Sequence, residues 1–100
     1  MIVIAGTFPI DGSRRDEIAA LVTSARAATL QEDGCVEYRL SFPADDANTM
    51  LIFEEWRDSA ALGVHGGGDN VKAFGRAIRE FLTGKPALSI YEVSTKGPLG

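Results

Sequence analysis

Apolar residues follow two periods along the chain, and each change of period marks the boundary of an element. Segments rich in β-branched residues, or with apolar and polar positions in alternation, predict four strands, at 2–10, 35–42, 49–57 and 87–94. Apolar positions spaced three and four residues apart predict helices. The expected helices are 13–33, which ends before Gly34, then the short 59–65, and 70–84.

The order of these elements is β-α-β-β-α-α-β, and a glycine-rich break at 66–70 separates the second helix from the third. With the short helix treated as an insertion, this order is typical of an α+β fold of the ferredoxin-like, split β-α-β type, with an antiparallel sheet. We expect a single domain over residues 1–94 and a loose C-terminal tail at 95–100.

The strands are apolar on both of their faces. In the strand 49–57, Met50 and Ile52 share one face, while Leu51 and Phe53 share the other. Two helices cover only one face of such a sheet, and no segment remains to cover the second. The pattern therefore predicts a homodimer whose two sheets pack together. In the strand 35–42, alternation places Tyr38 with Val36, and Arg39 with Cys35.

The composition argues against several classes of function. Net charge is −4 and the basic residues are scattered, so nucleic-acid binding is not expected. No apolar segment is long enough for a membrane span, and the N-terminal one lacks the basic flank of a signal peptide. Because the chain has a single cysteine, we expect a cytoplasmic protein without disulfides or a cysteine-based metal site.

Candidate chemistry is concentrated in the segment "FEEWRDSAALGVH" at 53–65, which holds the only Trp and the only His of the chain. Trp56 could simply fill the core and His65 could end a helix; alternatively, the two flank a pocket. Glu54 and Glu55 are adjacent on a strand, so they point to opposite faces and cannot form a paired acid site, although one of them could accept a proton alone. The glycines at 66–68 lack the residues of a phosphate-binding loop or a dinucleotide fingerprint.

The chain as a whole, over residues 2–94, resembles the antibiotic biosynthesis monooxygenase (ABM) domain family. The resemblance rests on "DGCVEYRL" at 33–40, "LIFEEWRDSAALGVH" at 51–65, "VKAF" at 71–74 and "YEV" at 91–93. It implies a dimeric α+β barrel that oxidises an electron-rich aromatic, such as a quinol or an anthrone, with O2. It also implies that no metal, flavin or haem cofactor is needed.

This chain differs from the family pattern at two places, which restricts the activities that the resemblance implies. Many relatives carry a His-Phe pair before the last helix, where this chain has Asn70-Val71. The haem-degrading relatives share Trp56, but they use an Asn in the first strand and a His in the later helix. Thr7 stands at the first of these places and no His at the second, so haem turnover is not expected.

The predicted site combines the resemblance with residue chemistry. His65 and Trp56 are the expected catalytic residues, with His65 as the base because histidine ordinarily titrates near neutral pH. The expected substrate contacts are Tyr38, Arg39, Phe74 and Asn70. We expect the pocket between the sheet and the helices, lined by Trp56, Tyr38, Phe74 and His65. The alternative is a barrel that binds or isomerises a small ligand without oxidising it.

Overall fold

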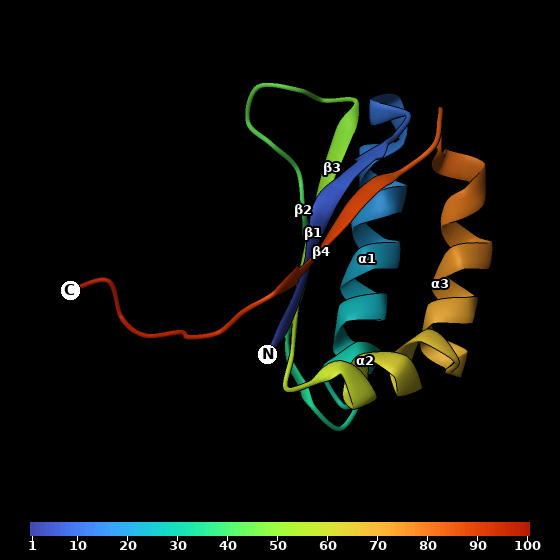
Figure 1. The fold of residues 1–100 in the computed structure, drawn as a ribbon. Helices are drawn as coiled ribbons and strands as arrows, with labels where there is room; N and C mark the ends of the chain where they lie inside the picture. Colours follow the sequence, from blue (N-terminus) through green and yellow to red (C-terminus); the bar gives the residue numbers. More distant parts are fainter.

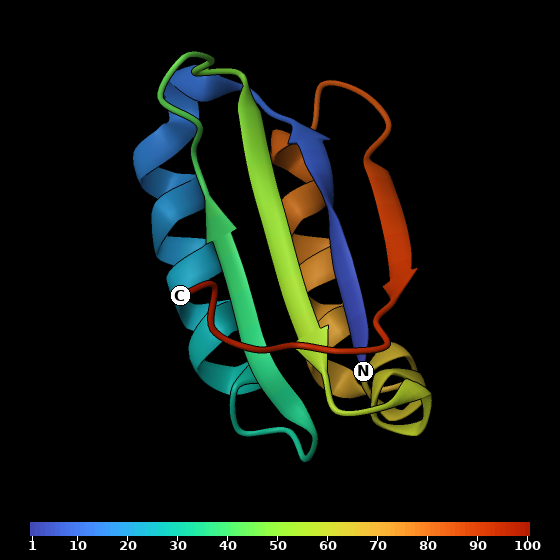
Figure 2. The ribbon, with the colours of Figure 1, turned by 60° about the vertical axis from the view of Figure 1, so that its left-hand side comes forward.

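The computed structural model describes all of residues 1–100 and contains one sheet with helices on one of its faces (Figures 1 and 2). The strands are β1 (Ile2–Pro9), β2 (Cys35–Ser41), β3 (Thr49–Trp56) and β4 (Ala87–Glu92). The helices are α1 (Arg15–Thr29), α2 (Ser59–Gly66) and α3 (Asp69–Ile78), with 3₁₀ turns at Gly12–Arg14 and Arg79–Phe81. The strand order is β2-β3-β1-β4, and every neighbouring pair is antiparallel. The predicted α+β ferredoxin-like class is therefore confirmed.

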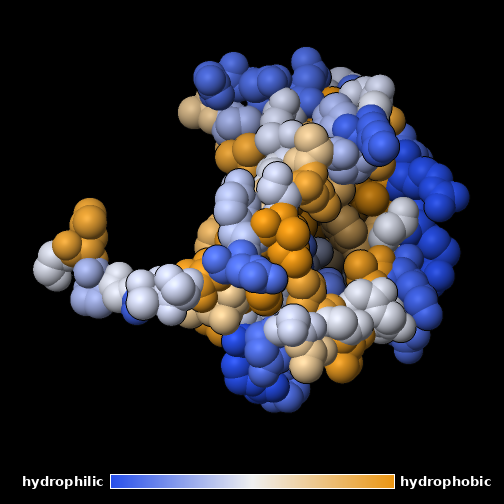
Figure 3. All heavy atoms as spheres, in the orientation of Figure 1, coloured by the Kyte–Doolittle hydropathy of each residue, from blue (hydrophilic) through white to orange (hydrophobic).

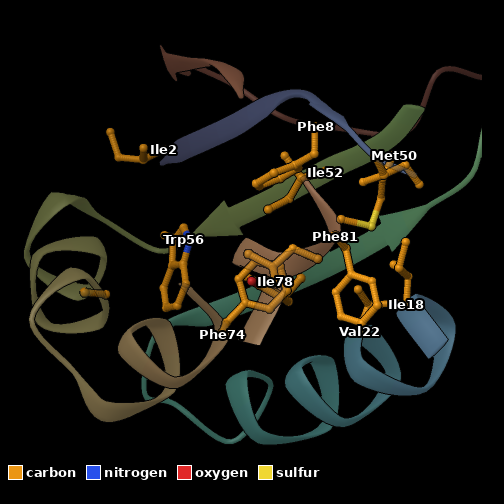
Figure 4. Packing of buried hydrophobic residues seen from close by; sticks show 13 residues of the cluster. Ile2, Phe8, Ile18, Val22, Met50, Ile52, Trp56, Phe74, Ile78 and Phe81 are labelled. Carbon is orange, nitrogen blue, oxygen red and sulfur yellow. The ribbon is translucent and has the colours of Figure 1, made fainter. Parts of the chain in front are cut away.

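The core fills the space between the sheet and the helices (Figure 4). Residues at helical spacing supply one side of it, with Ile18 and Val22 on α1 and Phe74 and Ile78 on α3. Alternate residues of the strands supply the other side, and Trp56 at the end of β3 has no solvent-exposed surface. Predicted and observed faces agree for β3, whose odd-numbered residues Leu51 and Phe53 remain partly exposed on the opposite face.

The predicted strands end one or two residues late, and two of the predicted helices are several residues too long. The first helix ends at Thr29 rather than near residue 33, because Gln31 and Glu32 donate to carbonyls three residues back and form tight turns. Gly34 then has a φ of 84°, a left-handed conformation that favours glycine. This tight connection brings the Glu32 side chain to His65 and Asn70. The predicted helix at 70–84 is α3 followed by a 3₁₀ turn.

A bulge at the start of β2 shifts which residues face the helices. The faces predicted from simple alternation are therefore wrong for Cys35 and Val36. Cys35 pairs with Trp56 and Glu37 with Glu55, so two residues of β2 oppose one step of β3. Cys35 consequently packs against the core, whereas Val36 is half exposed. Burial, followed by the charge of Glu32, raises the pKa of the Cys35 thiol to about 11, so the thiol stays protonated near neutral pH.

Residues 93–100 follow β4 without regular secondary structure and cross in front of the sheet, on the side away from the helices (Figure 2). Lys96 in this segment donates to Glu55 at 3.0 Å, and Glu55 is itself buried on that face. No helix of the protein is long and apolar enough to cross a membrane.

Candidate functional site

A cavity of about 290 Å³ lies between the sheet and α3. The space-filling view shows apolar atoms gathered around β4 and the hollow beside α3 (Figure 3). The polar groups among its lining residues are Tyr38, Glu54 and His65. The remaining lining residues are apolar or glycine: Phe8, Ile52, Val71, Phe74, Gly75, Ile78, Leu82, Pro86 and Leu88. The cavity thus has apolar walls and one polar end, as small-molecule sites commonly do.

The polar end is built from the last residues of β3 and the last turn of α2. Alternation along β3 turns Glu54 and Trp56 toward the helices, and the indole N–H of Trp56 donates to Glu54 Oε1 at 3.0 Å. Asp58 then caps α2 by accepting from the Ala61 backbone N–H at 2.9 Å. The helix carries His65 back over Trp56, so that the two ring centroids are 4.5 Å apart.

A second carboxylate holds the other side of the imidazole. Glu32, in the turn after α1, lies 2.9 Å from His65 Nδ1 and accepts from the Asn70 side-chain amide at 2.9 Å. His65 Nε2 faces Glu54, with 3.9 Å between Nε2 and Oε1. His65 therefore lies between two carboxylates, one fixed by Asn70 and the other by Trp56. A carboxylate on one ring nitrogen fixes the orientation of the imidazole and leaves the other nitrogen available for chemistry.

Three polar groups at the cavity have free hydrogen-bonding capacity. The Tyr38 hydroxyl, His65 Nε2 and the second carboxylate oxygen of Glu54 make no hydrogen bond within the protein, and none of these atoms is completely buried. Burial raises the pKa of the Glu54 carboxyl, and the Trp56 N–H and the charge of His65 only partly oppose this effect. Burial, followed by the charge of Glu54, also raises the pKa of the Tyr38 phenol, which therefore acts as a donor near neutral pH.

The structure brings together some of the residues predicted from the sequence. His65, Tyr38 and Phe74 line the cavity, while Trp56 lies behind His65 and Glu54 and does not itself form the wall. Asn70 does not reach the cavity: it lines a separate groove between α1 and α3 and contacts the site only through Glu32.

Arg39 is not brought to this site. It pairs with Phe53, which lies on the sheet face opposite the helices, and its guanidinium lies 3.4 Å from Glu37. Glu32 was not among the residues predicted from the sequence, and for Glu54 the sequence indicated only that it or Glu55 could accept a proton alone. The strand alternation indicated that Glu54 shares a face with Trp56, but no local pattern pointed to Glu32.

Replacing Glu54 with glutamine should increase stability more at pH 7 than at pH 4. A carboxyl whose pKa is higher in the folded state stabilises the fold below its unfolded pKa. That contribution is lost as the pH rises through the folded value. Glutamine keeps the acceptor for Trp56 without the buried charge. Thermal unfolding of both proteins at several pH values measures this, and a Tm difference that does not grow with pH would contradict it.

No group of three or more His, Cys, Asp or Glu side chains is arranged to hold a metal ion. The site combines an apolar cavity, an imidazole fixed between carboxylates, and a phenol donor. Such an arrangement can hold an aromatic ring against apolar walls and accept a proton from a hydroxyl group at its polar end.

The comparisons with known proteins agree with this fold. The family model described as "Antibiotic biosynthesis monooxygenase" matches residues 1–77, and the chain belongs to this family. The Bacillus subtilis protein named "Putative monooxygenase YcnE" is 25% identical over 83 residues, covering 83% of this chain and 87% of its own length. A Synechocystis protein, sll1783, is 33% identical over 64 residues, and this chain spans 44% of that relative's length.

Solved structures share the architecture over nearly the whole chain. Rv0793 from Mycobacterium tuberculosis superposes with a TM-score of 0.84 at 25% identity, covering 97% of this chain and 98% of that one. A Deinococcus radiodurans protein described as a "putative antibiotic biosynthesis monooxygenase" superposes with a TM-score of 0.89 at 23% identity, covering 100% of this chain and 99% of that one. At 23% identity, the similarity to the Deinococcus radiodurans protein shows a shared fold and nothing more.

Proposed function

We propose that the protein is a cofactor-independent monooxygenase that oxidises a small electron-rich aromatic, of the quinol or anthrone type, with O2. The observation that carries the proposal is the apolar cavity that ends at His65, which is held between Glu32 and Glu54. The family membership supports the reaction class, and the mostly apolar lining supports an aromatic substrate.

In this reaction His65 Nε2 accepts a proton from the substrate, and Glu32 stabilises the imidazolium that forms. The resulting electron-rich anion reduces O2 directly. The substrate loses two hydrogens and gains one oxygen atom, while the second oxygen leaves as water, so no additional reductant is needed. Tyr38 donates to the substrate oxygen, and Trp56 holds Glu54 and the imidazole in place.

We also propose that two copies pack through the sheet face opposite the helices. On this face Leu51, Phe53 and Tyr91 are 38%, 42% and 51% exposed, so a substantial apolar surface is uncovered in the single chain. A family dimer of this kind would bury roughly 2,000 Å² or more. A reducing cytoplasm remains our proposal for the compartment, because the one thiol has no disulfide partner in the chain.

Oxygen uptake tests the proposed activity. The purified protein is given a naphthoquinol or an anthrone in a closed cell with an oxygen electrode, and the uncatalysed oxidation is subtracted. We expect uptake proportional to enzyme and one oxygen atom from ¹⁸O2 in the product. Tight binding of these compounds without catalysed uptake would instead favour a ligand-binding barrel without oxidase activity.

A further inference from the structure

The charges around the cavity are unbalanced. Glu54 lines it and Glu32 lies behind His65, whereas no lysine or arginine is among the lining residues. Two nearby arginines are engaged elsewhere, since Arg26 binds Glu37 and Arg57 binds Asp33. The basic residues beside the lining segments, Lys72, Arg76 and Lys85, are exposed and do not line the cavity. The only lining group that can carry a positive charge is therefore the His65 imidazole, and it already lies between the two carboxylates of Glu32 and Glu54.

Glu54 is well placed to accept a hydrogen bond from the polar group of a ligand. One of its oxygens is held by the Trp56 N–H at 3.0 Å, which fixes the carboxyl, and the other has no protein partner. A ligand hydroxyl can donate to this free oxygen, whereas a ligand carboxylate or phosphate would only repel it. Burying such an anion among apolar side chains without a countercharge carries a large desolvation cost.

We propose that Glu54 makes the site selective for neutral hydroxyarenes and excludes those that carry a carboxylate or phosphate beside the hydroxyl. The inference rests on the proposed function only in taking this cavity as the binding site, and it makes no assumption about reaction with O2. It assigns Glu54 as a specificity-determining residue, in addition to any part that the carboxyl takes in proton transfer.

Binding of a matched ligand pair tests the proposal without turnover. We suggest 1-naphthol and 1-hydroxy-2-naphthoate, which share a ring and a hydroxyl and differ by one carboxylate. Calorimetry gives the affinities. Fluorescence of Trp56 provides a second signal, because it is the only Trp and its indole contacts Glu54. The wild type should bind 1-naphthol at least roughly tenfold more tightly, as expected for like charges a few ångströms apart at low effective dielectric.

The Glu54→Gln variant removes one charge while keeping the shape of the side chain, and it should reduce the preference to about threefold or less. Glu32→Gln, which changes the carboxyl behind His65, should reduce it by a smaller factor. Glu55→Gln is the matched control, because Glu55 is the adjacent residue and equally buried, but lies on the opposite sheet face. Its preference should equal that of the wild type.

The proposal is overturned if the wild type binds the carboxylate as tightly as the phenol, if neither ligand binds, or if Glu54→Gln and Glu55→Gln behave alike. Its failure can be distinguished from failure of the proposed reaction. Charge selectivity without catalysed oxygen uptake would keep this inference and reject the monooxygenase, and uptake with both ligands binding equally would do the reverse.

Discussion

Replacing His65 with glutamine is expected to lower catalysed oxygen uptake by about 10²–10⁴-fold, the range typical for a positioned acid–base group. Glutamine keeps a polar amide near the place of Nε2, but an amide does not accept a proton near neutral pH. The measurement is the initial rate of uptake with a naphthoquinol or an anthrone. Circular dichroism and thermal unfolding of the same preparation establish that the variant is folded.

Val64→Ala serves as the control on the same helix, because Val64 is 77% exposed and lies outside the cavity lining. Its uptake should match that of the wild type. If His65→Gln also retains wild-type uptake, His65 is a structural residue at the end of α2 and another group removes the proton.

Glu32→Gln should reduce the rate less than His65→Gln and displace the pH dependence of kcat, since it acts through the imidazole.

The neighbourhood of Trp56 and His65 could be predicted from the sequence because it is a local matter. Strand alternation fixes the side to which Trp56 points, and two helical turns after the Asp58 cap bring His65 back above it. Periodicity likewise fixes the four strands and their faces, with the β2 bulge as the exception. A bulge adds one residue to a ladder, and nothing in the alternation of "CVEYRL" marks where this occurs.

The role of Glu32 could not be predicted in this way. Its contact with His65 joins residues 33 positions apart and depends on tight turns that begin after Thr29, where the helical pattern itself could have continued. Arg39 was placed wrongly for a different reason, which is the side of the sheet to which it points. Its residue type suits a phenolate, and its neighbour Tyr38 does line the cavity, but one step along a strand moves a side chain to the other face of the sheet.

The sheet face opposite the helices has the composition of an interface. Phe53 lies near the middle of this face, paired with Ala5 on β1 and Arg39 on β2, and it is 42% exposed in the single chain. The one buried charge on this face, Glu55, is already neutralised by Lys96. A second copy could therefore pack here without leaving that carboxylate unpaired, which the desolvation cost of an isolated charge would otherwise oppose.

Substituting Phe53→Asp is accordingly expected to convert the proposed dimer into a folded monomer. In the single chain an aspartate at this half-exposed position is hydrated, whereas in a symmetric dimer two carboxylates enter the interface at several kcal/mol each. Because each 1.4 kcal/mol changes Kd tenfold, the dimer should weaken by at least about 10³-fold. Analytical ultracentrifugation over a dilution series measures this, with Val64→Asp on the exposed side of α2 as the matched control, expected to remain dimeric. A wild-type protein that sediments as a folded monomer at micromolar concentration, or a Phe53→Asp variant that dimerises normally, would show that this face is not the interface.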